Sequence, residues 1–220
     1  MIRGAIFDAD GTLFDSMFIW ESIGEDYLRS LGYEPKEKLN EVFKNMSLYQ
    51  AACYYREQYG VPLSTDAIMD GVNAQIEKYY KYEIGLKPYT ADFLERLGNM
   101  GVSMCIATAT DRPYVEAALK RCGIRKYFSE IFTCTSVGHG KDTPVIYREA
   151  MNHLKTNKES TLVFEDALHA AQTAKNDGFL VAAVYDKYEK EQAGLKEIAD
   201  VYLHDFNEWD VLQKFLSSLD

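Results

Sequence analysis

Short apolar runs alternate with amphipathic stretches along most of the chain. The first run covers residues 2–7, ends at Asp8 and predicts a buried strand. The later apolar runs are 102–107, 130–134, 161–164 and 180–184. The helical patterns between them cover 90–99, 112–122, 144–154 and 167–177. Strands and helices that alternate in this way are typical of βαβ units and predict a mostly parallel sheet.

Residues 16 to about 85 interrupt this alternation, because they contain no convincing strand. Their periodicity predicts helices over 16–31, 36–59 (in one or two pieces) and 65–82. Such a segment is too long for a simple crossover between two strands, so we expect an inserted domain. The predicted fold class is α/β, with a Rossmann-like parallel sheet core over 1–15 and 86–220 and an inserted all-helical cap domain over 16–85.

Composition narrows the class of protein. The 220 residues are 47% hydrophobic, which is enough for a substantial core, and they carry a net charge of −10. The acidity disfavours broad binding to nucleic acids or anionic membranes, but it leaves a small anionic substrate possible. The four cysteines form no CxxC pair, and no signal-like segment or long apolar run is present. We expect a soluble cytoplasmic protein, whose oligomeric state these patterns do not predict.

Polar side chains collect where the predicted strands end. The residues that follow successive strands are Asp8 and Asp10, then Thr108 and Ala109, then Lys141 in a glycine-containing loop, then Glu165 and Asp166. Ligands of open parallel sheets bind beyond the carboxyl ends of the strands. These residues are therefore predicted to form one site at one edge of the sheet.

The residue types in this set suit phosphate chemistry. Carboxylates placed close together repel one another unless a cation neutralises them, and oxygen ligands without His or Cys suit Mg²⁺. Lys141 and the Thr108 hydroxyl offer the positive charge and the hydrogen bond that a phosphoryl group needs. Asp8 could attack phosphorus, while Asp10 could protonate the leaving oxygen and then activate water.

Four motifs carry a resemblance to a known family. They are "DADGTLFDS", "CIATAT", Lys141 and "VFEDALHAAQTAKNDGF", in that order. Together they resemble the four motifs of the haloacid dehalogenase superfamily. The helical insert between the first and second motifs resembles the cap of the β-phosphoglucomutase and phosphoglycolate phosphatase branch. Dehalogenases and phosphonatases lack the second aspartate of the first motif, so Asp10 favours phosphate ester chemistry.

The resemblance implies a role for each candidate residue. It implies that Asp8 is the nucleophile and a Mg²⁺ ligand, and that Asp10 is the general acid and base, whose backbone carbonyl also binds the metal.

The remaining motifs imply phosphate and metal contacts. Thr108 and the Ala109 amide would hold phosphoryl oxygens, and Lys141 would stabilise the charge around them. Asp166 would supply a further metal carboxylate, with Glu165 as a direct or water-mediated ligand.

Three positions outside this set also bear on function. Asp15 and Ser16 are expected to cap the first helix of the insert and to mark the hinge. By ungapped counting, β-phosphoglucomutases have a histidine where this chain has Trp20. A mutase must retain and re-orient a sugar bisphosphate, so the loss of that polar contact favours hydrolysis. Trp20 itself could line a binding wall or simply pack.

The fourth motif departs from its usual form, EDSxxG, at Ala167 and Ala170. Both residues are small, so helix packing should survive, but the hydrogen bond of the serine is lost.

The sequence thus predicts a Mg²⁺-dependent phosphatase that hydrolyses a small phosphorylated metabolite through an aspartyl phosphate on Asp8. The alternative is a β-phosphoglucomutase-like sugar phosphomutase, in which a second substrate hydroxyl intercepts that intermediate. A non-catalytic binding protein with the same fold is disfavoured, because each expected chemical residue is present.

Overall fold

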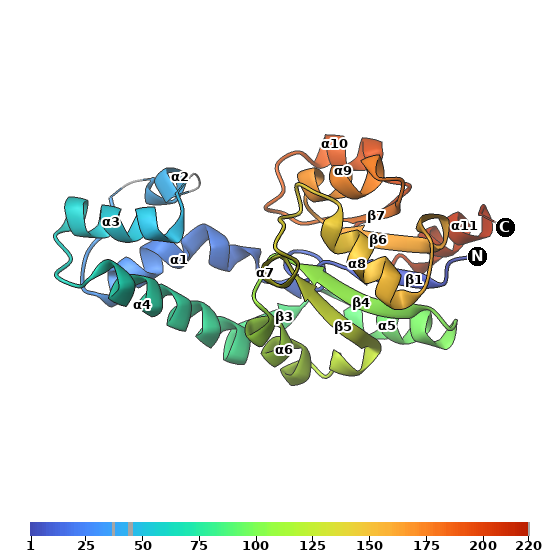
Figure 1. The fold of residues 1–220 in the computed structure, drawn as a ribbon, viewed down its shortest axis with the longest axis horizontal. Coiled ribbons are helices and arrows are strands. Elements are labelled where there is room, and N and C mark those ends of the chain that lie inside the picture. Colours follow the sequence, from blue (N-terminus) through green and yellow to red (C-terminus); the bar gives the residue numbers. More distant parts are fainter. Residues whose placement is uncertain (37, 44–45, 220) are drawn as a thin grey trace. The chain divides into compact units, whose positions relative to one another are not determined.

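The computed structural model describes residues 1–36, 38–43 and 46–219 (Figure 1). The chain divides into two compact units, one made of 1–15 with 84–220 and the other of 16–83. We refer to them as the sheet unit and the helical unit. The functional division into a catalytic core and a cap, with boundaries at 15/16 and 85/86, stays a prediction.

The sheet unit is built on a six-stranded sheet with the order β5-β4-β1-β6-β7-β8. Its strands are β1 (Gly4–Phe7), β4 (Ser103–Thr108), β5 (Phe128–Thr133), β6 (Thr161–Glu165), β7 (Leu180–Val184) and β8 (Val201–Leu203). All neighbouring strands pair in parallel. β1 lies between β4 and β6, and all its residues are buried, as its continuous apolar run predicts.

Helices cover both faces of this sheet (Figure 1). They are α5 (Thr90–Asn99), α6 (Arg112–Arg121), α7 (Cys134–Val137), α8 (Val145–Leu154), α9 (Leu168–Asn176), α10 (Gln192–Ile198) and α11 (Trp209–Ser217). Ile6 packs in the cluster that includes residues of α8, α9 and α10. Its neighbour Phe7 stacks on Phe164, which contacts Phe93 of α5. Successive strand residues face opposite sides, so the two helical layers share one buried sheet. The predicted α/β fold is confirmed.

A two-stranded antiparallel sheet lies where the chain leaves and re-enters the sheet unit. It pairs β2 (Phe14–Asp15) with β3 (Gly85–Leu86). Asp15 is therefore an exposed strand residue and not a helix cap, which corrects the interpretation from sequence. Ser16 takes the N-cap position of α1 but makes no side-chain capping hydrogen bond.

The helical unit contains α1 (Met17–Ser30), α2 (Leu39–Phe43), α3 (Leu48–Tyr59), α4 (Thr65–Lys78) and a π-helical turn (Tyr79–Glu83). Ser47 and Gln50 form a capping box at the start of α3, and Ser64 caps α4. Of the helix predicted over 36–59, residues 37 and 44–45 lie outside the described residues. Within the part of the chain that is described, no helix is long and apolar enough to span a membrane.

Candidate active site

The order of the strands brings three of the motifs together. Phe7, the last residue of β1, is in register with Ile106 of β4 and Phe164 of β6. The residues that follow these three strands consequently emerge side by side at the carboxyl edge of the sheet. Asp8 is placed between the end of β4 on one side and Glu165 on the other.

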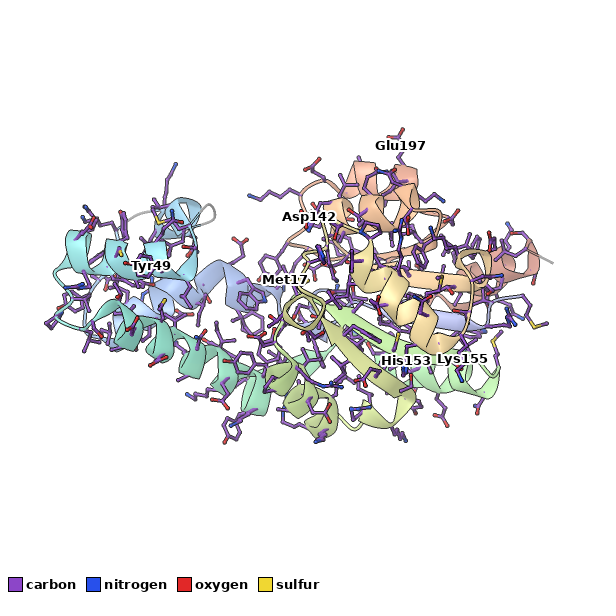
Figure 2. The ribbon with its side chains drawn as sticks, in the orientation of Figure 1. Met17, Tyr49, Asp142, His153, Lys155 and Glu197 are labelled. Carbon is purple, nitrogen blue, oxygen red and sulfur yellow. The ribbon has the colours of Figure 1, made fainter. Side chains whose placement is uncertain are left out.

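Lys141 reaches this edge from the loop between α7 and α8, where its neighbour Asp142 is labelled in Figure 2. The Lys141 Nζ donates to Asp8 Oδ1, and it donates to Glu165 Oε1 at 2.6 Å. The Tyr147 hydroxyl of α8 donates to the same Glu165 oxygen at 2.8 Å. All four side chains are buried, so these contacts are charge-assisted bonds in a site with little water.

Asp166 is held from the first motif. The Thr12 hydroxyl donates to Asp166 Oδ1 at 2.9 Å. Gly11 has a φ of 79°, and a Cβ at that position would overlap the Asp166 carboxylate. Glycine is thus required both by the backbone conformation and by the close approach of a carboxylate.

Three carboxylates at this edge could hold a metal ion. Asp8, Glu165 and Asp166 each offer an oxygen, and these oxygens lie within 4.8 Å of one another. A set made only of buried carboxylates suits a hard cation such as Mg²⁺, which also leaves room for water and phosphate oxygens as ligands. The residues present therefore fit the expected metal.

Asp10 and the second motif meet on the β4 side of Asp8. The Thr110 hydroxyl donates to Asp10 Oδ2 at 2.7 Å, and the Thr110 backbone N–H donates to the Thr108 hydroxyl at 3.1 Å. Thr108 is buried at the strand end, whereas Ala109 is exposed. Asp10, Thr108 and Ala109, the residues predicted from the first two motifs, thus lie at the carboxyl edge of the sheet.

The electrostatics of the cluster favour a bound cation. Burial raises the pKa of Asp8 to about 7, against the opposing charge of Lys141 and with the support of Glu165 and Asp10. Burial alone would disfavour the charge of Lys141, but Asp8 and Glu165 raise its pKa above the ordinary range. Lys141 is therefore a permanent ammonium at neutral pH, and it does not by itself keep Asp8 ionised.

Sequence reasoning missed several supporting side chains. Tyr147, Thr12 and Thr110 all donate to candidate site residues. Tyr147 lies outside the four motifs, whereas Thr12 and Thr110 lie within the first and second motifs but were given no role from them. Ala167 is the N-cap of α9 and offers no capping side chain, but Glu189 Oε2 accepts from the Leu168 N–H at 3.0 Å. A carboxylate from the loop after β7 thus supplies an acceptor at the helix start, where Ala167 has none.

Two histidines and an aspartate lie near the motifs in the sequence. His139 and His169 are both exposed. Asp111 is the N-cap residue of α6, makes no side-chain capping bond and accepts from the Thr135 hydroxyl at 2.8 Å.

Comparison with known proteins places the chain among hydrolases. The chain is 27% identical over 215 residues to protein CbbY of Cereibacter sphaeroides, covering 92% of this chain and 93% of that protein. It is 27% identical over 197 residues to a phosphoglycolate phosphatase of Rhodobacter capsulatus, covering 86% and 87% of the two chains. The crystal structure of CbbY from Rhodobacter sphaeroides in complex with phosphate superposes with a TM-score of 0.74 at 27% identity, covering 94% of this chain and 96% of that one.

The match to the haloacid dehalogenase-like hydrolase family spans residues 5–184, so it includes all four motifs. The predicted enzyme class, a phosphoric monoester hydrolase of this family, is confirmed by that match and by the phosphatases among the relatives. The chain belongs to the haloacid dehalogenase-like hydrolase family.

Proposed function

We propose that this protein is a Mg²⁺-dependent phosphatase that hydrolyses a small phosphorylated metabolite through an aspartyl phosphate on Asp8. The observation that carries the proposal is the buried cluster of Asp8, Glu165 and Asp166 with Lys141 bonded to two of the three. A nucleophile, a metal-binding carboxylate set and a fixed cation are the parts that phosphoryl transfer requires.

In the first step, an Asp8 carboxylate oxygen forms a bond to phosphorus as the bond from phosphorus to the leaving alcohol breaks. Asp10 gives its proton to that alcohol. In the second step, Asp10 takes a proton from water, whose oxygen attacks the same phosphorus and releases Asp8 and inorganic phosphate. The hydrogen bond from the Thr110 hydroxyl to Asp10 Oδ2 fixes the orientation of the Asp10 carboxylate.

Lys141 compensates the negative charge that gathers around Asp8 as the phosphoryl group is transferred. The Thr108 hydroxyl and the Ala109 amide, at the end of β4, would bind phosphoryl oxygens. A metal ion held by Asp8, Asp166, Glu165 and the Asp10 carbonyl would add positive charge that neutralises the carboxylates and polarises the phosphoryl group. In this proposal the helical segment 16–85 acts as a cap that excludes water and selects the leaving group.

The substrate class that the relatives support is a small phosphorylated acid or sugar. CbbY of Rhodobacter sphaeroides has been crystallised with xylulose-(1,5)bisphosphate, and another relative is a phosphoglycolate phosphatase. A sugar phosphomutase shares the first step and differs only in what intercepts the aspartyl phosphate. Trp20 favours water over a retained sugar hydroxyl, for the reason given above.

The test compares Asp8→Asn with Asp15→Asn, the same chemical change at an exposed position of the same motif. Release of phosphate from an aryl phosphate with Mg²⁺ should fall by about 10³-fold or more in Asp8→Asn and stay within about threefold in the control. Wild-type hydrolysis by Asp8→Asn would contradict the mechanism. A panel of sugar phosphates and phosphoglycolate then identifies the substrate, and an isomerised sugar phosphate without free phosphate would favour the mutase.

A further inference from the structure

A second buried ion pair lies at the same edge of the sheet and is not part of the mechanism above. Lys87 Nζ and Asp186 Oδ2 are 2.9 Å apart, and their side chains are only 10% and 3% exposed. Lys87 Nζ also donates to the Tyr185 carbonyl at 2.5 Å. Moving two charges out of water is costly, and the attraction between them offsets that cost only where the geometry is favourable, so a buried pair is weak evidence for a role in stability.

The position of Lys87 connects it with Asp166. Its backbone N–H donates to the Leu13 carbonyl at 2.9 Å, and Leu13 follows Thr12, whose hydroxyl holds Asp166. Asp166 accepts a hydrogen bond from the uncharged hydroxyl of Thr12, whereas Asp8 and Glu165 both pair with the ammonium of Lys141.

Asp186 approaches from the other side. It lies two residues beyond the end of β7, a strand in which Ala183 is in register with Glu165 of β6. Asp186 Oδ1 also accepts from the Tyr188 N–H at 2.9 Å, which fixes the carboxylate in the loop after β7.

The charge of Lys87 acts on the carboxylate cluster. The Lys87 ammonium donates to the carbonyl of Tyr185, two residues beyond Ala183, and Ala183 is in register with Glu165, so the charge lies beside the strand end that carries Asp166. A cation that stabilises the ionised form of a metal-binding carboxylate also repels a metal ion at the same carboxylate. Asp186 screens that repulsion, because it places a negative charge directly against Lys87.

We propose that Lys87 and Asp186 form a charge pair that sets the affinity of the Asp8–Glu165–Asp166 cluster for its divalent cation. Lys87 weakens the binding of the cation by electrostatic repulsion, and the negative charge of Asp186 reduces that repulsion. The inference rests on the proposed function, since it requires a cation at this cluster. It adds two positioning residues that do not contact the metal or the substrate.

The pair gives a signature that a structural role would not produce. Lys87→Met removes a positive charge and should tighten Mg²⁺ binding about three- to tenfold. Asp186→Asn removes the neighbouring negative charge and should weaken it by a similar factor. The double variant should bind within about twofold of wild type. A purely structural pair would weaken binding in both single variants.

The experiment is calorimetric titration of the metal-free protein with Mg²⁺, without substrate. Lys175→Met and Asp200→Asn are the matched controls, because these residues form an ion pair of 2.6 Å in the same unit but at the amino end of β7, where Asp200 accepts from the Val181 N–H. Neither control should change the affinity.

The outcomes separate the inference from the proposed function. If wild type binds no Mg²⁺, the metal assignment itself fails, and the inference fails with it. If wild type binds but both single variants shift the affinity in one direction, or neither shifts it, the inference alone is overturned. Lys87→Gln and Asp186→Ser keep a polar side chain at each position and carry the same expectation if the first variants do not fold.

Discussion

The carboxyl edge of the sheet and the helical unit differ in where their charged side chains lie. At the edge, Asp8, Lys141 and Glu165 are all buried and bonded to one another. In the described part of the helical unit, by contrast, the ion pair between Arg29 and Glu25 lies at the surface, with side chains 47% and 22% exposed. Exposed pairs of that kind contribute little to stability, whereas buried carboxylates are costly to keep.

The interior of the helical unit is instead apolar and aromatic. Its buried residues include Ile19, Leu28 and Ile68, together with Tyr55, whose hydroxyl donates to the Gly24 carbonyl at 2.6 Å. Such an interior stabilises its own unit through burial of apolar surface. Buried charge thus lowers stability at the sheet edge, whereas burial of apolar surface raises it in the helical unit, so the same substitution should have different consequences in the two regions.

The largest difference should appear in the response of stability to pH. Burial raises the pKa of Asp8 to about 7 in the folded chain. Between its ordinary value and about 7, the folded state binds more protons than the unfolded state, so stability falls as pH rises through this window. Asn is neutral throughout. The stabilisation of the metal-free protein by Asp8→Asn should therefore be about 2–3 kcal/mol larger at pH 8 than at pH 5.

The measurement is urea unfolding in the presence of a chelator at both pH values. Asp70→Asn is the control in the helical unit, because Asp70 is an exposed residue of α4. It should change stability by less than about 0.5 kcal/mol at either pH. Equal effects of the two substitutions would remove the distinction drawn between the regions.

Two buried tyrosines allow a matched test with a smaller expected effect. Tyr147 donates to Glu165 at the edge, and Tyr55 donates to Gly24 in the helical unit. Tyr→Phe at either position removes one hydrogen bond and should cost about 1 kcal/mol of unfolding free energy. Only Tyr147→Phe should also lower kcat, by about three- to tenfold. The Glu165 carboxylate then loses the hydrogen bond from Tyr147 that helps to fix it beside Lys141. Steady-state kinetics beside urea unfolding checks both parts, and a similar loss of kcat in Tyr55→Phe would contradict it.

The two regions also differ in how far the sequence predicts them. Strand β1 and the residues that follow it are predictable, because a continuous apolar run that ends in carboxylates combines a buried strand with a site. The clustering of Asp8 with Glu165 and Asp166 then follows from the parallel order of the strands, although the roles of these residues stay predictions. β2 and β3 have two residues each, too few for any period to be visible.

The hydrophobic periodicity of a sequence does not predict contacts between residues that are far apart along the chain. Lys87 and Asp186 meet only because β7 lies next to β6 and because the chain re-enters the sheet unit beside Leu13. Neither residue stands in a motif. Tyr147 is similar: the apolar face of α8 predicts its burial, but not the carboxylate that receives its hydroxyl. In the helical unit, the sequence predicts the order of the helices but not which residues would contact a substrate.

The smallest expected effect concerns the start of α9, where Ala167→Ser should compensate in part for the loss of the Glu189 carboxylate. Glu189 supplies the acceptor that Ala167 lacks, so Glu189→Ala should cost about 1 kcal/mol of unfolding free energy. Ala167 has φ −95° and ψ 127°, the extended conformation of an N-cap residue, so Ala167→Ser introduces a hydroxyl that can accept from the first turn. In the Glu189→Ala background, Ala167→Ser should recover about 0.5–1 kcal/mol, and in wild type it should gain less. Urea unfolding of the four proteins measures this coupling, and strictly additive effects would mean that the two side chains do not serve the same helix end.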